Sequence, residues 1–322
     1  MTPSLIEIKK LHKKYNLSGS IWNSKKRVIS AVNNVSLQIY KGETLGLVGE
    51  SGCGKSTLAR LIARLEKPSS GNIYFKGEDI FLYDRKALKA YRRNVQLIFQ
   101  DPYSSLNPRK SAASIIKEPL TIQRIGNKDQ RRESVTQLME KVGLSREQAH
   151  RYPHEFSGGQ RQRIGIARAL VLQPELIIAD EPVSALDVSI QAQILNLLKD
   201  LKQDFGLTYL FISHDLNVIR HMSDRIAVMY LGRIVELAEN REIYEHPFHP
   251  YTRMLLSALP ECDPAGKRRI ATIKGEAGTE NNRGCNFQNR CPDKGVICSE
   301  QEPVLMQIED EKFCACHLTG SI

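Results

Sequence analysis

The stretch that decides the fold reads Gly49-Glu50-Ser51-Gly52-Cys53-Gly54-Lys55-Ser56. It fits the pattern G-x-x-x-x-G-K-[ST], in which a glycine-rich loop closes its backbone N–H groups around phosphate oxygens. An apolar run at 44–48 precedes the loop, and a helix is expected from Lys55 to about Leu65. The amino terminus of that helix would add positive potential beside the loop. This order of strand, loop and helix predicts a phosphate-binding site and disfavours a chance match in a glycine-rich turn.

The residue types of the loop indicate how a nucleotide would be held. Lys55 is expected to reach the β- and γ-phosphates of ATP, and Ser56 to ligate Mg²⁺ through its hydroxyl. The remaining contacts are expected from Gly49, Ser51, Gly52, Gly54 and Thr57. Cys53 fills a variable position, so it is assigned no chemistry. ATP and Mg²⁺ are therefore the predicted cofactors.

A second buried run, 176–179, ends in two carboxylates, Asp180 and Glu181. A strand of a parallel sheet would deliver Asp180 beside the magnesium ion, which prefers oxygen ligands. Glu181 is one residue further and points elsewhere, where it can polarise an attacking water as a general base. The alternative interpretation is that both residues merely end a strand.

Strands alternate with helices along most of the chain. Strands are predicted at 4–15, 32–40, 44–48, 71–75, 95–99, 176–179 and 208–213, with a hairpin at 225–236 around Gly232. Helical patterns cover 55–65, 111–143, 158–172 and 190–205, and 16–30 is expected to be a loop. This order is typical of an α/β fold with a mainly parallel sheet covered on both faces. From about 260 the composition shifts toward Gly, Asn, Pro and Cys, which predicts a linker and a small C-terminal module.

Bulk composition excludes several classes of protein. The 322 residues include 46 Lys and Arg against 36 Asp and Glu, a net charge of +10. These basic residues are spread along the chain, which favours a solvated surface over a nucleic-acid face. No apolar run approaches the roughly 18 residues that span a bilayer, and the start lacks the pattern of a signal peptide. We therefore expect a cytoplasmic chain that touches a membrane only through partners.

Four further elements carry a resemblance to a known family. Phe156-Ser157-Gly158-Gly159-Gln160 resembles the signature of ABC (ATP-binding cassette) ATPases, with Phe where Leu is more usual. Ser184-Ala185-Leu186-Asp187 resembles their D-loop, His214 their switch histidine and Gln100 their Q-loop glutamine. The elements occur in the family's order and cover about residues 5–240. The resemblance implies a P-loop NTPase fold with a RecA-like parallel core sheet, an antiparallel β-subdomain and an inserted helical subdomain at about 101–172. It places the whole nucleotide-binding domain at 1–259.

The resemblance also implies a mechanism of ATP hydrolysis. Two subunits would pack head to tail, so that the signature, with Ser157 and Gly159, contacts the partner's γ-phosphate from a helix amino terminus. Asp187 would reach across the dimer interface. His214 would bond the γ-phosphate and hold the attacking water, and Gln100 would touch magnesium or water.

Tyr15 is the aromatic residue that the resemblance places against adenine. It lies upstream of the phosphate loop, as in the family. Stacking on a base is tolerant of sequence, so a core-filling role is the alternative for Tyr15. For His214 alone, a core or capping role would be the corresponding alternative.

Three stretches resemble one branch of the family, the ATPases of bacterial dipeptide, oligopeptide and nickel importers. They are 99–109 around Gln100, 249–256, and the cysteine-containing segment 284–318. The branch implies a peripheral subunit on the cytoplasmic face of the cell membrane. Its expected partners are a second, different ABC ATPase, two transmembrane permeases and an external solute-binding protein, with no nucleic acid. The cargo and the role of 16–30 do not follow from the chain.

The predicted extension, 260–322, holds Cys285, Cys291, Cys298 and Cys316. Their spacings do not match the short C-x₂-C pairs of common zinc sites. Four thiolates can hold a [4Fe–4S] cluster, which is what similarity to this branch implies. Zinc, or cysteines that only pack, remain alternatives. Cys314 and His317 are further candidate ligands.

Two competing functions deserve comparison. A soluble ABC ATPase acting on nucleic acid would fit the basic charge, but the chain has no long coiled coil, second cassette or zinc-type spacing. A regulatory subunit with a dead site is disfavoured because Lys55, Asp180, Glu181 and His214 are all present.

Overall fold

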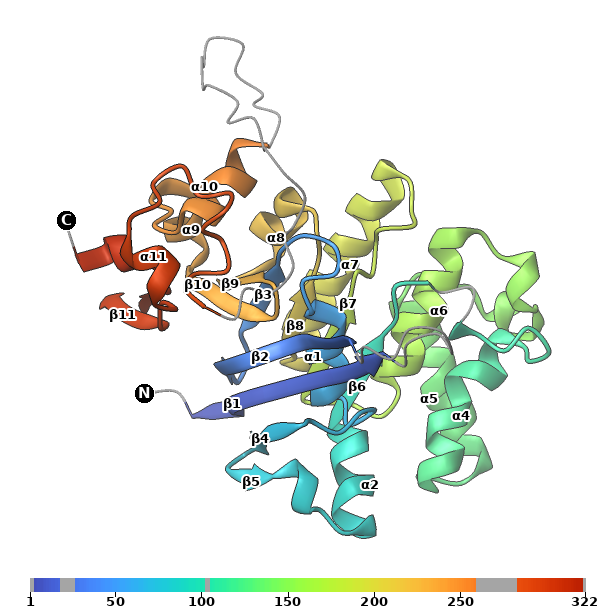
Figure 1. Cartoon of the computed structure of the whole chain (residues 1–322). Helices are drawn as coiled ribbons and strands as arrows, with labels where there is room; N and C mark the ends of the chain where they lie inside the picture. Colours follow the sequence, from blue (N-terminus) through green and yellow to red (C-terminus); the bar gives the residue numbers. More distant parts are fainter. Residues whose placement is uncertain (1–2, 18–26, 102–104, 259–282, 321–322) are drawn as a thin grey trace, which may run out of the picture.

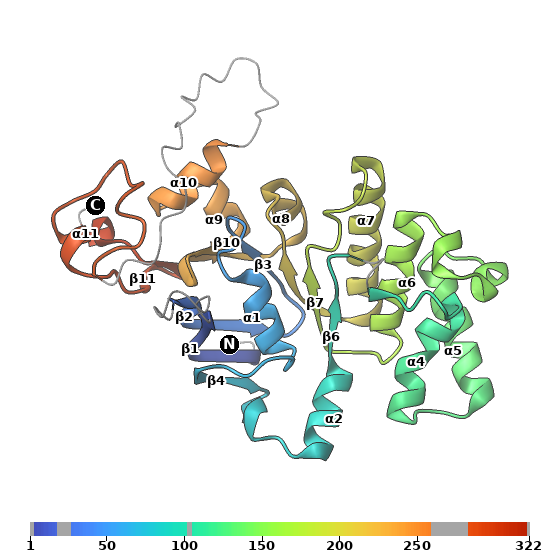
Figure 2. The same ribbon diagram turned by 45° about the vertical axis from the view of Figure 1, so that its right-hand side comes forward.

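The computed structural model describes residues 3–17, 27–101, 105–258 and 283–320. Within them the chain forms a four-stranded antiparallel sheet, in the order β2-β1-β4-β5, and an eight-stranded sheet, in the order β11-β12-β10-β9-β3-β8-β7-β6. Figure 1 shows helices α4, α5 and α6 gathered to one side of the larger sheet. The C-terminal elements α11 and β11 lie at its opposite side (Figures 1 and 2).

The strands run as β1 Ser4–Leu17, β2 Arg27–Tyr40, β3 Thr44–Val48, β4 Ser70–Phe75, β5 Glu78–Asp79, β6 Val95–Ile98, β7 Leu176–Asp180, β8 Thr208–Ile212, β9 Arg225–Tyr230, β10 Arg233–Glu239, β11 Met306–Glu309 and β12 Lys312–Cys314. The helices are α1 Lys55–Ile62, α2 Arg85–Asn94, α4 Ala112–Gln123, α5 Lys128–Lys141, α6 Gly158–Leu170, α7 Val188–Phe205, α8 Leu216–Met222, α9 Asn240–Glu245, α10 Pro250–Ser257 and α11 Ile297–Glu300. Short 3₁₀ turns lie at 80–82, 146–150, 153–155 and 317–320.

The centre of the larger sheet is parallel and buried on both faces, as predicted. Strands β6, β7, β8, β3 and β9 pair in parallel in that order. Alternate residues of β7 enter different cores. Ile177 and Ala179 pack with the helices α4 to α10. Leu176 and Ile178 pack with α1 and the small sheet, which Figure 2 shows side by side. Burial on both faces explains why these strands read as continuous apolar runs.

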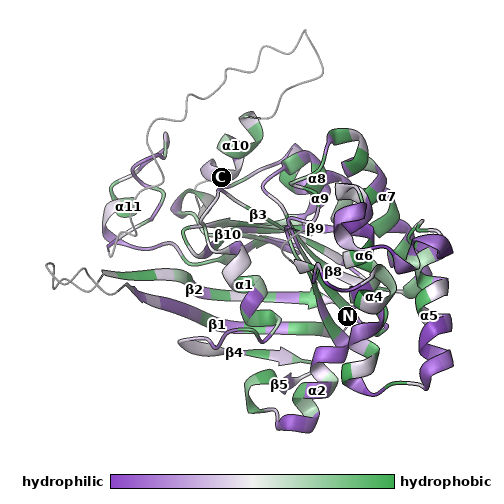
Figure 3. Cartoon of the chain, turned by 90° about the vertical axis from the view of Figure 1, so that its right-hand side faces the viewer, coloured by the Kyte–Doolittle hydropathy of each residue, from purple (hydrophilic) through white to green (hydrophobic). Residues whose placement is uncertain are grey.

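Capping residues set where the helices α2, α4 and α5 begin and end. The predicted helix at 111–143 is two helices, because Arg124 adopts a left-handed backbone at φ 60° and Asn127 then caps α5 in a capping box with Gln130. Hydrophilic colours dominate α5 in Figure 3, as expected of an outer helix. Helix α2 was not predicted; Asp84 caps it, with the Ala87 N–H donating to the carboxylate at 2.7 Å.

The expected loop at 16–30 is partly wrong. Strand β1 continues to Leu17 and β2 begins at Arg27, so both extend into this range as a paired ribbon. Residues 18–26 lie outside the described part of the chain, as do 102–104 of the stretch after Gln100 and 259–282 at the predicted linker.

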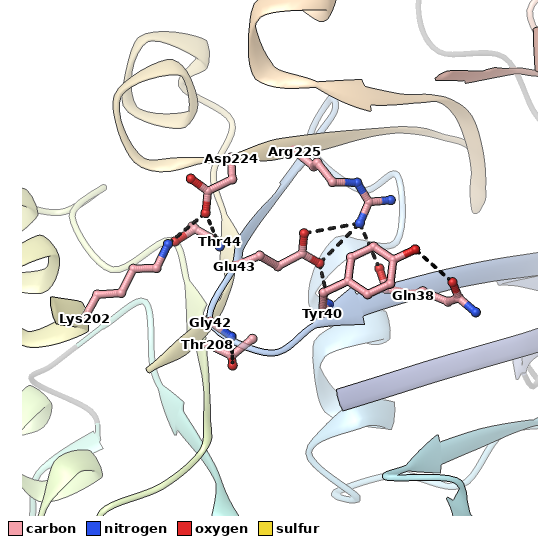
Figure 4. A network of polar contacts seen from close by, with 9 residues as sticks. All are labelled: Gln38, Tyr40, Gly42, Glu43, Thr44, Lys202, Thr208, Asp224 and Arg225. Carbon is pink, nitrogen blue, oxygen red and sulfur yellow. Dashed lines mark hydrogen bonds and ion pairs between the residues drawn. The ribbon is translucent and has the colours of Figure 1, made fainter. Parts of the chain in front are cut away.

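A polar network holds the amino ends of the central strands (Figure 4). Arg225, which begins β9, pairs with Glu43 at 3.2 Å in the turn between β2 and β3. Asp224 accepts the Thr44 N–H at 2.7 Å and the Lys202 ammonium at 2.8 Å, which ties α7 to the same corner. These contacts fix the strands at one end, so their carboxyl ends open together at the other, where α/β sheets bind ligands.

The C-terminal segment continues the larger sheet. Strand β12 pairs antiparallel with β10, and β11 pairs with β12. Lys312 of β12 is buried, pairs with Glu242 at 2.9 Å and lies 4.0 Å from the Phe248 ring centroid. Phe287 packs against Tyr230 at a centroid distance of 5.3 Å. The segment is therefore packed on β9, β10 and α9 by strand pairing, a buried charge and an aromatic contact.

Candidate nucleotide site

The phosphate loop joins the carboxyl end of β3 to α1. Gly54 ends the loop at φ 110°, and a Cβ there would lie 2.1 Å from the Ala31 carbonyl oxygen of β2. Only glycine combines this conformation with so close an approach. The loop is thus backed by β2, which fixes where its N–H groups point.

Lys55 opens α1 with its side chain almost fully buried. Its ammonium donates to the Gly49 carbonyl at 2.6 Å and to the Glu50 carbonyl at 3.0 Å. Cys53 lies 3.6 Å from the same nitrogen, and burial raises the pKa of its thiol in spite of the nearby positive charge. Cys53 is therefore a buried thiol, which agrees with its assignment to no chemistry.

Ser56 and Asp180 meet at the entrance to α1. The Ser56 hydroxyl donates to Asp180 Oδ1 at 3.1 Å. Burial raises the pKa of Asp180, and the hydrogen bond from Ser56 opposes the shift. A hydroxyl and a carboxylate side by side are hard oxygen donors, so this pair fits Mg²⁺.

Glu181 is the centre of a second cluster. Gln100 Nε2, just beyond β6, donates to Glu181 Oε2 at 2.8 Å. His214 Nδ1, just beyond β8, lies 3.2 Å from the same oxygen. The Glu181 N–H donates to the Ile212 carbonyl at 2.9 Å, and its backbone is left-handed at φ 47°. Because β6, β7 and β8 are parallel neighbours, their carboxyl ends bring these three side chains together.

Ser56 of the first cluster and all three side chains of the second line one hollow of about 480 Å³. Its walls are Ala31, Ser51, Gly52, Gly54, Lys55, Ser56, Thr57, Gln100, Glu181 and His214. The structure therefore brings together most of the residues predicted to act on phosphate.

The signature residues are not among those that line the hollow. Ser157 caps α6, where its hydroxyl accepts the Gln160 N–H at 3.3 Å and Gln160 Oε1 accepts the Ser157 N–H at 3.1 Å. A Cβ on Gly159 would lie 2.6 Å from Ile190 of α7, so close packing of the two helices requires glycine here. Asp187 precedes α7. Gly158 begins α6, and the capping box formed by Ser157 and Gln160 orders the amino terminus of this helix.

Tyr15 is half buried and belongs to neither buried core cluster. Its hydroxyl donates to Glu66 Oε2 at 2.5 Å, and the Lys13 ammonium lies 5.0 Å from its ring centroid. Burial and the Glu66 carboxylate raise the pKa of Tyr15. The ring is thus held in place at the surface, which disfavours a core-filling role.

The predicted cluster ligands gather on three short segments of the extension. The Cys285 N–H donates to the Cys298 carbonyl at 2.8 Å. Burial raises the pKa of the Cys285 thiol, and the nearby thiols of Cys298 and Cys316 raise it further. Burial raises the pKa of Cys291 to about 11, with added effects from Asp293, Cys316 and Cys285. In the described ranges, no three His, Cys, Asp or Glu side chains are arranged to hold a metal ion. A [4Fe–4S] cluster takes four thiolates, so the cluster stays a prediction from the sequence.

Sequence reasoning missed two contacts to the phosphate loop from the C-terminal half. The Glu50 N–H donates to the Tyr251 hydroxyl of α10 at 2.9 Å. The Glu50 carboxylate pairs with Arg290 of the extension. Sequence reasoning used the segment 249–256 only for its family resemblance, and nothing in that segment predicted a contact with the phosphate loop.

The site combines a glycine-rich phosphate loop with the Ser56–Asp180 pair and with Glu181 at the ends of parallel strands. This arrangement is that of a P-loop NTPase. The ABC transporter family profile matches residues 32–184, and a profile for the C-terminal region of oligopeptide/dipeptide transporters matches residues 235–298. The chain belongs to the oligopeptide/dipeptide transport branch of the ABC transporter family, as the sequence resemblance predicted.

Two transport ATP-binding proteins are similar to this chain in sequence over most of its length. The oligopeptide transport ATP-binding protein AppF of Bacillus subtilis is 52% identical over 320 residues, covering 98% of this chain and 97% of AppF. The dipeptide transport ATP-binding protein DppF of Escherichia coli is 50% identical over 281 residues, covering 87% of this chain and 84% of DppF. A dimeric post-hydrolysis structure of the ATP-binding cassette MJ0796 with ADP and Pi has a TM-score of 0.65 and 32% identity, covering 73% of this chain and 99% of that one. None of the helices described here is long and apolar enough to cross a bilayer.

Proposed function

We propose that the chain hydrolyses ATP to drive the import of dipeptides, oligopeptides or related solutes across a bacterial cytoplasmic membrane. The observation that carries the catalytic part is the Glu181 carboxylate, held by Gln100 and near His214 at the phosphate loop. The names of the relatives and the match to the oligopeptide/dipeptide C-terminal profile support the cargo class.

Several residues that line the hollow, together with the adjoining Asp180, have proposed roles in hydrolysis. Lys55 and the loop N–H groups bind the β- and γ-phosphates. Glu181 accepts a proton from the water that attacks the γ-phosphorus, while the bond to the β-phosphate oxygen breaks. His214 and Gln100 orient that water and the γ-phosphate. Ser56 and Asp180, with Gln100, would hold Mg²⁺, which neutralises charge on the phosphate oxygens.

The signature would act on a second subunit's nucleotide. We propose that Ser157, Gly158, Gly159 and Gln160 present the amino terminus of α6 to the partner's γ-phosphate, and that Asp187 reaches across the interface. The capping box at Ser157 supports this because it leaves the helix end ordered before any partner arrives. Tyr15 would stack on adenine.

The proposed assembly contains a second, different ABC ATPase, two transmembrane permeases and an external solute-binding protein, with this subunit peripheral on the cytoplasmic face. The proposed boundaries are 1–259 for the nucleotide-binding domain, with its helical subdomain at 101–172, and 260–322 for the extension. Gentle detergent extraction and affinity capture, with mass spectrometry of the captured chains, tests the assembly. Two permeases and a second ATPase are expected; capture of nucleic acid without membrane chains would overturn the importer proposal.

We further propose that Cys285, Cys291, Cys298 and Cys316 hold a [4Fe–4S] cluster. Support comes from the effects that these thiols exert on one another's pKa, which place them near one another although no three described side chains are arranged as metal ligands. A bound cluster would join these segments, and no step of hydrolysis depends on it. Iron and acid-labile sulfide would be assayed after anaerobic purification. Zinc without sulfide would replace the cluster with a zinc site, and absence of both elements would leave packing as the role of these cysteines.

A further inference from the structure

Arg290 of the extension forms a two-bond ion pair with Glu50, the second residue of the phosphate loop. Its Nη1 donates to Glu50 Oε2 at 2.8 Å and its Nη2 to Glu50 Oε1 at 2.7 Å. This is the parallel, two-bond geometry that makes arginine–carboxylate pairs strong and directional. The Arg290 side chain is 5% exposed and that of Glu50 28% exposed, so water screens the pair less than it would at the surface.

The guanidinium is held in this position from several sides. It lies 5.8 Å from the Tyr230 ring centroid and 5.9 Å from that of Phe287. Met254 Sδ lies 3.9 Å from Nη2. The hydrogen bonds to Glu50 raise the pKa of Arg290, and Tyr230 raises it further, against the opposing effect of burial. Arginine is therefore preorganised to meet one carboxylate, and that carboxylate belongs to the loop.

Glu50 is fixed through its backbone as well. Its N–H donates to the Tyr251 hydroxyl at 2.9 Å, and its carbonyl accepts from the Lys55 ammonium at 3.0 Å. The residue therefore links the extension and α10 directly to the lysine expected to bind phosphate. A displacement of Arg290 would therefore move Glu50, and through Glu50 it would change the positions of the loop N–H groups and of Lys55.

We propose that Arg290 is a positioning residue for the phosphate loop, through which the C-terminal extension sets the affinity of this site for ATP. The proposal deepens, and rests on, the assignment of the hollow as the ATP site. Arg290, which binds the phosphate loop through Glu50, directly precedes Cys291 in the chain. A group bound by the cysteines would therefore be linked to the loop through two consecutive residues. The extension thereby acts on nucleotide binding.

The test compares nucleotide binding and ATPase kinetics in the full-length chain purified with its partners. Arg290→Ala removes both bonds, and Arg290→Lys keeps the charge but not the two-bond geometry. Glu50→Gln and the double variant complete a cycle that separates the pair from other effects. Arg253→Ala is the matched control, because Arg253 also pairs with the extension, at Asp293 over 3.3 Å, but does not contact Glu50.

For Arg290→Ala, we expect the KM for ATP and the Kd of a fluorescent ATP analogue to rise about fivefold or more, with kcat nearly retained. Arg290→Lys should recover part of the affinity, and the double variant should be no weaker than Arg290→Ala alone. Unchanged KM and Kd with a lowered melting temperature would show that the pair is only structural. An equal loss in Arg253→Ala would also overturn the proposal.

Lys55→Ala separates this inference from the assignment of the ATP site. If Lys55→Ala abolishes analogue binding while Arg290→Ala has no effect, the ATP site stands and the inference fails. If Lys55→Ala binds the analogue normally, the site itself is misassigned. If Arg290→Ala does not fold, Arg290→Lys takes its place in the test. A raised KM for ATP with kcat retained in Arg290→Lys would support the proposal, and an unchanged KM would overturn it.

Discussion

His214 Nδ1 lies 3.2 Å from Glu181 Oε2, at the ends of the neighbouring parallel strands β8 and β7. Gln100, which follows β6, donates to the same carboxylate oxygen. One oxygen of Glu181 is therefore contacted from the ends of β6 and β8, the two strands that flank β7. A carboxylate held in this way is oriented before substrate arrives, which lowers the cost of reaching a reactive geometry.

Replacing that carboxylate should separate binding from hydrolysis. We expect Glu181→Gln to lower kcat by about a hundredfold to ten-thousandfold, the usual range for loss of a general base. ATP binding should persist because Lys55 and the loop are untouched. The measurement is phosphate release together with binding of labelled ATP. Glu175→Gln, just before the other end of β7, is the control and should behave as wild type. Full hydrolysis by Glu181→Gln would rule out the assigned role.

Tyr15 offers a test of adenine recognition. Tyr15→Ala removes the ring, and we expect ATP affinity to fall by about 1–3 kcal/mol, the range for one base stacked on an aromatic side chain. Tyr15→Phe loses the hydroxyl bond to Glu66 but keeps the ring, so its affinity should stay near wild type. Titration with ATP and with inorganic triphosphate separates the base from the phosphates. Equal losses for both ligands would contradict stacking.

Ser157 allows the cap to be separated from catalysis. Ser157→Ala removes the cap on α6 and should cost about 1 kcal/mol of unfolding free energy. If Ser157 also contacts the partner's nucleotide, the kcat of the assembled ATPase should fall while ATP binding to this subunit's own loop is retained. Ser157→Thr keeps a hydroxyl and should restore most of both. A stability loss in Ser157→Ala without any change in kcat would confine Ser157 to capping.

His249 predicts a dependence of stability on pH. Burial lowers its pKa to about 3, and its Nδ1 accepts the Tyr251 N–H at 3.0 Å. The unfolded histidine titrates near about 6.5, so below that pH the unfolded chain takes up a proton that the folded chain refuses. The stability contribution is therefore complete above about pH 6.5 and is lost as the pH falls toward about 3.

His249→Asn keeps an acceptor for the cap but cannot titrate. Between about pH 6 and about pH 4, the fall in unfolding free energy should be shallower in the variant by up to about 1.4 kcal/mol per pH unit. Urea unfolding across this range measures the slope, with the exposed His154 as the site of a control substitution. Parallel slopes for wild type and His249→Asn would exclude the effect.

The nucleotide site could be predicted from sequence because its physics is local. The phosphate loop needs glycines and a lysine at fixed spacing, and β3 and β7 are apolar runs that end at that chemistry. The meeting of Gln100, Glu181 and His214 then follows from a parallel sheet, which the alternation of strands and helices predicts.

The C-terminal contacts could not be predicted in this way. Strand β12 is only three residues long and includes the buried Lys312, which no apolar pattern reveals. Arg290 and Glu50 are separated by 240 positions, and nothing in either neighbourhood indicates the other. Helix α2 is short and strongly polar, so its start depends on the Asp84 cap more than on periodicity.

The pairing of β12 with β10 also bears on solubility. Residues Ile234 to Ala238 of β10 are all buried, and without β12 this strand would present unpaired N–H and C=O groups along an apolar flank. Such a border invites another chain to add itself as a strand, whereas the four-residue β11, with its exposed Gln307 and Glu309, ends the sheet in a short polar stretch. A chain shortened to the proposed nucleotide-binding domain would retain every residue that we assign to phosphate binding and yet tend to aggregate.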